Sequence, residues 1–337
     1  MTDDIRHDIS PAPGRPQAPP LLIIGHGTRS SLGVAEFHEL VDLVRKSAER
    51  QVVPPAAVAG GFLELAPPPL TQSVAELVAA GHRHISVVPL VLVAAGHAKG
   101  DVPAALERER RRNPGVTFDY GRALGPHPAL QAAMDTRVDA VLDRSLRSET
   151  MLLVVGRGTT DPDANAELAK VARLLEEGRD FAGVEYGFIS LAEPGVQAAL
   201  ELCRRLGATR IVVVPYFLFA GVLPDRVVAQ TVAYAAEHPE LDVRSAGLLG
   251  ATTELADLVL ERWSEIQGGD LRSNCDTCLY RTALPGFEAK VGAPQTPHDH
   301  PDDPTHPHGD HAHDHAHGHG HGHGHGAHDH GHGHAHA

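Results

Sequence analysis

The chain has 337 residues, a formal net charge of −14 and only three cysteines. This length accommodates two domains of ordinary size, whereas the acidic balance argues against nucleic-acid binding, which needs a basic face. The longest apolar run, 85–96, is much shorter than the roughly 20 residues that span a bilayer, and three cysteines are too few for a disulfide framework. We therefore expect a cytoplasmic protein that binds small molecules or metals, with no nucleic-acid or membrane partner.

The chain is expected to begin with a disordered leader over residues 1–19. This stretch carries acids and prolines and lacks the apolar core of a secretory signal.

The middle of the chain contains an internal repeat. LLIIGHGTRS (21–30) recurs as LLVVGRGTTD (152–161), and GFLELAPPPL (61–70) recurs as GFISLAEPGV (187–196). Residues 79–96 likewise match residues 205–221. The repeat predicts two duplicated domains, 20–147 and 148–267.

Each half alternates short apolar runs with amphipathic helical stretches. The predicted strands are 21–24, 57–63, 85–93 and 116–120 in the first half, and 151–155, 184–189, 210–218 and 241–244 in the second. Continuous Val/Ile/Leu runs are typical of strands buried on both faces. We therefore predict an α/β fold with two small parallel sheets, each with helices on both faces.

Local patterns predict where two of the helices begin. Ser73 and Glu76 have the spacing of a capping box, and Asp161 precedes a proline that suits a first helical turn. Cys203 has helical spacing with apolar neighbours, which predicts a core position.

Three ionisable residues follow successive predicted strands of the first half: His26, Glu64 and His97. The carboxyl ends of parallel strands meet at one edge of a sheet, so these side chains are expected to converge there. Two imidazoles and a carboxylate can bind a borderline divalent metal and can also accept protons near neutral pH. The alternative is that each is an ordinary surface residue of a loop.

The second half has lost this set. At the equivalent positions it has Arg157, Ser190 and Leu223 or its neighbour. Arg157 and Arg226 suit a substrate that is an anion, although ordinary surface ion pairs would explain them equally well.

The repeat ends near residue 267. An extension over 268–297 carries Cys275 and Cys278, a ligand-spaced pair that needs further ligands to complete a zinc or iron–sulfur site. The tail, 298–337, is too polar to bury a core and is expected to be disordered. Its histidines are expected to bind Co²⁺, Ni²⁺, Cu²⁺ or Zn²⁺ as a metal buffer or delivery strand, with an expression tag as the alternative. The run consists of His311, His313, His315, His317, His319, His321, His323 and His325.

The motifs LLIIGHGTRS, GGFLELAPPPL and VVPLVLVAAGHAKGDVP resemble those of the long, two-domain sirohydrochlorin cobaltochelatases, which are class II chelatases. YRTALPGFEAKVGAPQ, the cysteine pair and the tail are similar to their C-terminal extension. The resemblance implies ATP-independent insertion of Co²⁺ into sirohydrochlorin, a polycarboxylate tetrapyrrole, in cobalamin biosynthesis. It places His26, Glu64 and His97 in catalysis, with His26 and His97 as metal ligands.

The resemblance also implies an iron–sulfur centre at the cysteine pair, with a zinc or regulatory thiol site or no cofactor as the alternatives. The related ferrochelatases and nickel chelatases share the strand-and-histidine motifs, so Fe²⁺ and Ni²⁺ stay open as the metal. A metal-storage or metallochaperone protein is the alternative from another class. The sequence leaves open the oligomeric state and which histidine binds metal and which moves protons.

Overall fold

A computed structural model describes residues 18–271, 278–281 and 283–293. Most of the predicted leader, Cys275 and the histidine-rich tail lie outside these residues. Ala18, near the end of the predicted leader, already forms a bridge with Pro55.

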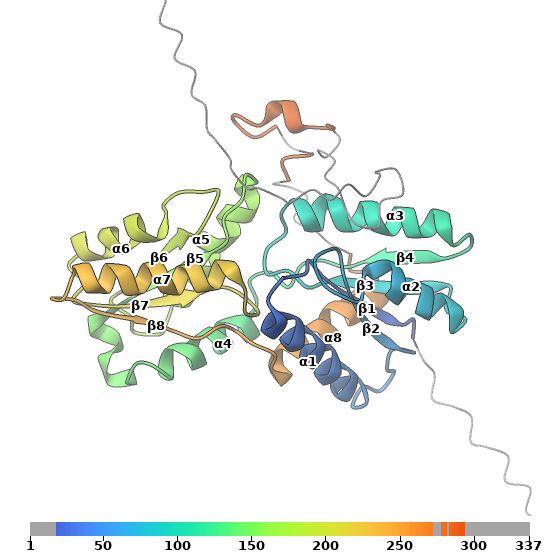
Figure 1. Cartoon of the computed structure of the whole chain (residues 1–337), viewed down its shortest axis with the longest axis horizontal. Helices are drawn as coiled ribbons and strands as arrows, with labels where there is room; N and C mark the ends of the chain where they lie inside the picture. Colours follow the sequence, from blue (N-terminus) through green and yellow to red (C-terminus); the bar gives the residue numbers. More distant parts are fainter. Residues whose placement is uncertain (1–17, 272–277, 282, 294–337) are drawn as a thin grey trace, which may run out of the picture. The chain divides into compact units, whose positions relative to one another are not determined.

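The protein contains two four-stranded parallel sheets with the same topology (Figure 1). The strand order is β2-β1-β3-β4 in the first sheet and β6-β5-β7-β8 in the second. The first sheet comprises β1 (Leu21–Gly25), β2 (Val58–Phe62), β3 (His84–Pro89) and β4 (Thr117–Tyr120). The second comprises β5 (Thr150–Gly156), β6 (Gly183–Phe188), β7 (Arg210–Pro215) and β8 (Asp242–Ser245). The predicted duplicated α/β fold is confirmed.

The central strands are buried on both faces, as their continuous apolar runs predict. In β1, Leu21 and Ile23 belong to one cluster of core side chains, whereas Leu22 and Ile24 belong to the cluster on the opposite face. Side chains of a strand point alternately to its two faces, so one short strand contributes to two cores.

Two strands end earlier than predicted. Both β3 and β7 end at a proline, Pro89 and Pro215, and the apolar residues that follow them are not in the sheet. The backbone N–H of Leu90 still donates to the carbonyl of Ile24. Because β1 ends at Gly25, the residues after Leu90 have no strand of β1 beside them to pair with. The apolar character of Leu92 reflects packing against the core instead of continued strand pairing.

Eight α-helices flank the sheets in the described part of the chain. They are α1 (Ser31–Ala48), α2 (Leu70–Ala79), α3 (Val102–Arg112), α4 (Pro128–Asp139), α5 (Pro162–Glu176), α6 (Val196–Arg205), α7 (Val222–Glu237) and α8 (Thr253–Gln267). A π-helical turn, η1 (His97–Asp101), precedes α3, and two 3₁₀ turns are η2 (Arg144–Glu149) and η3 (Glu288–Lys290).

The last helix of each half packs against the sheet of the other half. Helix α8 lies along α1 of the first half (Figure 1), and the buried Arg262 of α8 donates hydrogen bonds to the carbonyls of Ala123 (3.2 Å) and Leu124 (2.8 Å). Conversely, α4 packs on β7, and its Arg137 donates to the carbonyl of Leu249 at 2.8 Å. The two sheets therefore share one continuous apolar core along these faces.

The local predictions about helix starts and the core had different outcomes. Asp161 caps α5 by accepting a hydrogen bond from the N–H of Asp163, with Pro162 in the first turn, as predicted. The capping box at Ser73 is wrong, because α2 begins earlier and the buried Ser73 hydroxyl donates to the carbonyl of Gly60. Cys203 is buried as predicted, and burial raises the pKa of its thiol to about 12.

None of the helices in the described residues is both long enough and apolar enough to cross a lipid bilayer.

Candidate functional site

The backbone of the first sheet places His26 and Glu64 side by side. His26 directly follows β1, and Glu64 comes two residues after β2. Beyond the strands the pairing continues into the loops, because the N–H of Leu63 donates to Gly25 (2.9 Å) and the N–H of Glu64 donates to His26 (3.1 Å). The two loops are thus held at the carboxyl edge of the sheet.

This approach of the loops requires a glycine. Gly27 has a φ of +107°, and a Cβ atom at this position would lie 1.8 Å from the carbonyl oxygen of Glu64. The second half repeats the arrangement at Gly158, where a Cβ atom would lie 1.9 Å from the carbonyl oxygen of Ser190. The GHG sequence is therefore a tight turn that lets a neighbouring loop approach closely.

His97 comes to the same edge from η1, which it opens. Strand order reverses between β1 and β3, and parallel sheets form ligand crevices at such a point. The Nε2 atoms of His26 and His97 lie 3.0 Å apart, with their rings edge to face. His26 Nε2 is also 3.4 Å from Glu64 Oε1. The three sequence-predicted residues therefore lie together, and each is partly exposed.

The outer nitrogens of the two imidazoles face oxygen acceptors. Nδ1 of His97 is 2.5 Å from Oδ2 of Asp101, and Nδ1 of His26 is 3.3 Å from the carbonyl oxygen of Gly27. The short contact with Asp101 favours a proton on Nδ1 of His97, which leaves a lone pair on its Nε2 atom. This lone pair can accept a hydrogen bond from Nε2 of His26 at 3.0 Å, and it can also bind a metal ion.

His26 contacts both of the other two side chains directly. Within the described residues, no group of three or more His, Cys, Asp or Glu side chains is already spread around a common metal position. Coordination of one ion by all three side chains therefore requires rotation of the side chains, which their partial exposure allows.

Arg157 of the second half faces this group. It follows β5, the counterpart of β1, and its side chain is exposed. Desolvation lowers the pKa of the Arg157 guanidinium, and the negative charge of Glu64 opposes that shift. The charge of this guanidinium suits an anion.

The predicted role of Arg226 stays a prediction. Its side chain is exposed in the first turns of α7, and no hydrogen bond or ion pair joins it to another described residue. The counterpart of His97 is Val222, the neighbour of Leu223, since each is the first residue of its turn or helix after a glycine.

Lys99 connects the turn that carries His97 to the second half. Its Nζ atom lies 2.7 Å from Asp161 Oδ2 and 2.8 Å from Asp163 Oδ2, and all three side chains are at most 8% exposed. Burial opposes the charged form of Lys99, but hydrogen bonds to the two carboxylates outweigh it, so that its pKa is raised.

Sequence reasoning assigned no role to Asp101 or Lys99. Asp101 lies four positions after His97, the spacing that brings side chains together on a helical turn, and this spacing was the available signal. The ion pairs of Lys99 join segments that are distant in sequence, and no local pattern indicates them.

The C-terminal candidates are only partly described. Cys278 is buried with a free thiol, whereas Cys275 and the histidines from His311 to His325 lie outside the described residues. The cysteine pair and the tail therefore remain sequence predictions.

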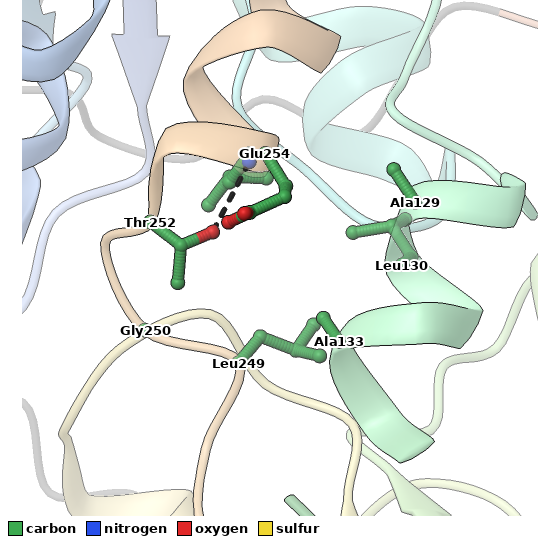
Figure 2. Close-up of a pocket in the computed structure, with 8 residues that line it drawn as sticks. Ala129, Leu130, Ala133, Leu249, Gly250, Thr252 and Glu254 are labelled. Carbon is green, nitrogen blue, oxygen red and sulfur yellow. Dashed lines mark hydrogen bonds between the residues drawn. The ribbon is translucent and has the colours of Figure 1, made fainter. Parts of the chain in front are cut away.

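A small hollow elsewhere in the protein is not a substrate site. It lies between α4 and the start of α8 (Figure 2), and its volume of about 10 Å³ is enough for one water molecule. Thr252 caps α8 here by accepting a hydrogen bond from the N–H of Leu255. None of the proposed site residues lines this hollow.

Comparisons with known proteins agree with the duplication. The CbiX family model matches residues 20–141 and again residues 151–266. A sirohydrochlorin cobaltochelatase of Priestia megaterium is 33% identical over 266 residues, which cover 78% of this chain and 85% of that protein. A sirohydrochlorin ferrochelatase of the same organism is 30% identical over 208 residues, covering 61% and 76% of the two chains. The structure of SirB from Bacillus subtilis with Fe³⁺ matches with a TM-score of 0.63 and 27% identity, covering 75% of this chain and 98% of that one.

Proposed function

Because the chain belongs to the CbiX family, whose model matches both of its halves, we propose that it is a sirohydrochlorin chelatase whose metal is Co²⁺. The observation that carries this proposal is the 3.0 Å approach of the Nε2 atoms of His26 and His97, beside the carboxylate of Glu64. Two nitrogen ligands and a proton acceptor are what insertion of a divalent ion into a protonated macrocycle requires.

The reaction exchanges two protons for one metal ion. The ion loses water as it binds the neutral imidazoles of His26 and His97, whose site stays open on one side for the macrocycle. Two pyrrole N–H protons then leave, and an imidazole or Glu64 accepts them. The net charge of the macrocycle is unchanged, and none of these steps uses a nucleotide. The sequence has no phosphate-binding loop of the G-x-x-x-x-G-K-[ST] type, in agreement with this mechanism.

The substrate carries carboxylates, and Arg157 supplies a cation that can bind them. The guanidinium can bind a carboxylate through two parallel hydrogen bonds. Its side chain is exposed, and Glu64 is the charged group that acts on its pKa, so we expect Arg157 to be available to an incoming anion. Arg226 is a second candidate for this role, supported only by its exposure on α7.

Two observations favour cobalt. The cobaltochelatase relative matches a longer part of the chain than the ferrochelatase relative does. The histidine-rich tail presents imidazoles, which are good ligands for Co²⁺ and Ni²⁺. A ferrochelatase is the second candidate, favoured by the similarity to the ferrochelatase of Priestia megaterium.

A competition experiment tests the proposal. Purified full-length protein is incubated without oxygen with sirohydrochlorin and equal Co²⁺, Fe²⁺ and Ni²⁺, and the products are followed by absorbance and identified by mass. We expect cobalt-sirohydrochlorin to form first and fastest. Preferential iron insertion would make the protein a ferrochelatase, and insertion no faster than in protein-free solution would exclude a chelatase. The variant with both His26→Ala and His97→Ala keeps the tail and separates insertion from mere metal storage.

A further inference from the structure

A π-helical turn carries both His97 and a buried carboxylate. In η1 the N–H of Val102 donates to the carbonyl of His97, which is the wide hydrogen-bonding pattern of a π-helix. Such turns are rare in proteins, and those that occur often lie at functional sites. The side chain of Asp101 returns to the imidazole at the start of the turn, and its Oδ2 atom lies 2.5 Å from His97 Nδ1.

The contact between Asp101 and His97 is directional and shielded from water. The side chain of Asp101 is only 6% exposed. An ionised carboxylate can only accept hydrogen bonds, so Nδ1 of His97 must donate. With its proton on Nδ1, the ring has its lone pair on Nε2, the atom that faces His26 at 3.0 Å.

We propose that Asp101 is a positioning residue that acts through His97. It holds the imidazole in the tautomer and in the orientation that direct the Nε2 lone pair toward the incoming metal ion. This inference rests on the proposed chelatase function. Carboxylates that orient metal-binding histidines typically change metal affinity or activity by about 10–100-fold when they are removed.

The turn is held in place independently of Asp101. The hydroxyl of Tyr120 donates to the carbonyl of Ala98 at 2.9 Å, and Lys99 is bound to two carboxylates of the second half. Loss of the Asp101 carboxylate therefore leaves the backbone of the turn anchored. We therefore expect the effect of such a change on insertion to come from the orientation and tautomer of the His97 ring.

A double-mutant cycle tests this role in the full-length protein. Asp101→Ala, His97→Ala and the double variant are compared for kcat and for the KM of Co²⁺ during insertion into sirohydrochlorin. We expect Asp101→Ala to lower kcat/KM for Co²⁺ by about 10–100-fold. In the His97→Ala background the same change should have no further effect, because the ring that Asp101 orients is gone. Asp101→Asn keeps a side chain of the same shape with one acceptor oxygen, so it should retain part of the insertion rate. It replaces Asp101→Ala in the cycle if the alanine variant does not fold.

The matched control is Asp119→Asn. Asp119 also pairs with a histidine, since its Oδ2 atom lies 2.9 Å from Nε2 of His84, but this pair is on β4 and at the amino end of β3. The Asp119→Asn variant should therefore insert cobalt at the wild-type rate. Equal losses from Asp101→Ala in both backgrounds would show a structural role and overturn the proposal, as would a wild-type rate in Asp101→Ala. A wild-type rate in His97→Ala would instead overturn the site on which the proposed function depends.

Discussion

The Nε2 atoms of His26 and His97 lie 3.0 Å apart although 71 positions separate the two residues in the chain. Nitrogen atoms bound to the same transition-metal ion at about 2.1 Å are separated by a similar distance when their bonds are roughly perpendicular. The folded chain thus holds two imidazoles close to the spacing that a single ion requires.

The first prediction concerns these two histidines. His26→Ala and His97→Ala should each lower the insertion rate by at least about 100-fold, because each removes a metal ligand and a proton acceptor. Both residues are partly exposed, so the free energy of unfolding should change little. The measurement is initial insertion rate beside urea unfolding, with the exposed His84→Ala as the control. Wild-type rates in both variants would contradict the site.

The second prediction concerns substrate binding by Arg157. Arg157→Ala should raise the KM for sirohydrochlorin by about 10–100-fold, the loss expected for a charge-assisted hydrogen bond, with a smaller change in kcat. Arg157→Lys should recover only part of the affinity, because lysine cannot form paired hydrogen bonds. Arg173→Ala on α5 is the control, since Arg173 pairs with Glu176 at the protein surface. An unchanged KM in Arg157→Ala would remove this residue from the substrate site.

The third prediction concerns the buried cluster around Lys99. Lys99→Met should lower the free energy of unfolding by about 3–5 kcal/mol, because it leaves the carboxylates of Asp161 and Asp163 buried without their cation. Adding Asp161→Asn and Asp163→Asn should restore much of the loss, and asparagine can still cap α5. Urea unfolding measures both effects. A loss below about 1 kcal/mol in Lys99→Met would show that water reaches these carboxylates.

The fourth prediction concerns Gly27. Gly27→Ala should push the loop of Glu64 away and lower the insertion rate by about 100-fold, as displacement of a catalytic group by about 1 Å can do. The matched control is Gly81→Ala, whose φ of +95° is similarly unfavourable for alanine but whose Cβ atom would meet nothing within 4 Å. The control should lose about 1–2 kcal/mol of stability and keep its activity. Equal activity losses would point to a general effect of backbone strain.

The fifth prediction concerns the histidine-rich tail. A chain that ends at Gln295 should insert cobalt at the full rate when the metal is saturating, because the residues of the proposed site are retained. When free Co²⁺ is held low by a chelating buffer, the shortened chain should fall behind the full-length protein, since it lacks imidazoles that gather the ion. Loss of all insertion at saturating cobalt would assign the tail to the chemistry itself.

Much of the fold could be predicted from the sequence because the information is local and repeated. Every predicted strand is present, since a run such as LLIIG must be buried on both faces wherever it lies. The ends of β3 and β7 could not be placed, because the residues after Pro89 and Pro215 are apolar for packing and have no strand beside them. Ser73 illustrates the same limit, since its hydroxyl binds a carbonyl of β2 instead of its own helix.

The residues of the candidate site that follow strands could be predicted from the sequence. His26, Glu64 and His97 follow successive strands, and parallel pairing brings such positions to one edge of a sheet. The interactions of Asp101 and Lys99 depend on the conformation of η1 and on contact with the second half. Asp101 has only its four-residue spacing from His97 as a local signal, and Lys99 has none, so their contacts emerge from the three-dimensional arrangement.

The exchange of α4 and α8 between the halves affects how a protein of this kind can be divided or can move. A polypeptide cut near residue 147 would yield two fragments, each with one sheet face stripped of its covering helix and with Arg262 or Arg137 separated from its carbonyl partners. Movement of one half relative to the other would likewise have to preserve or break these hydrogen bonds.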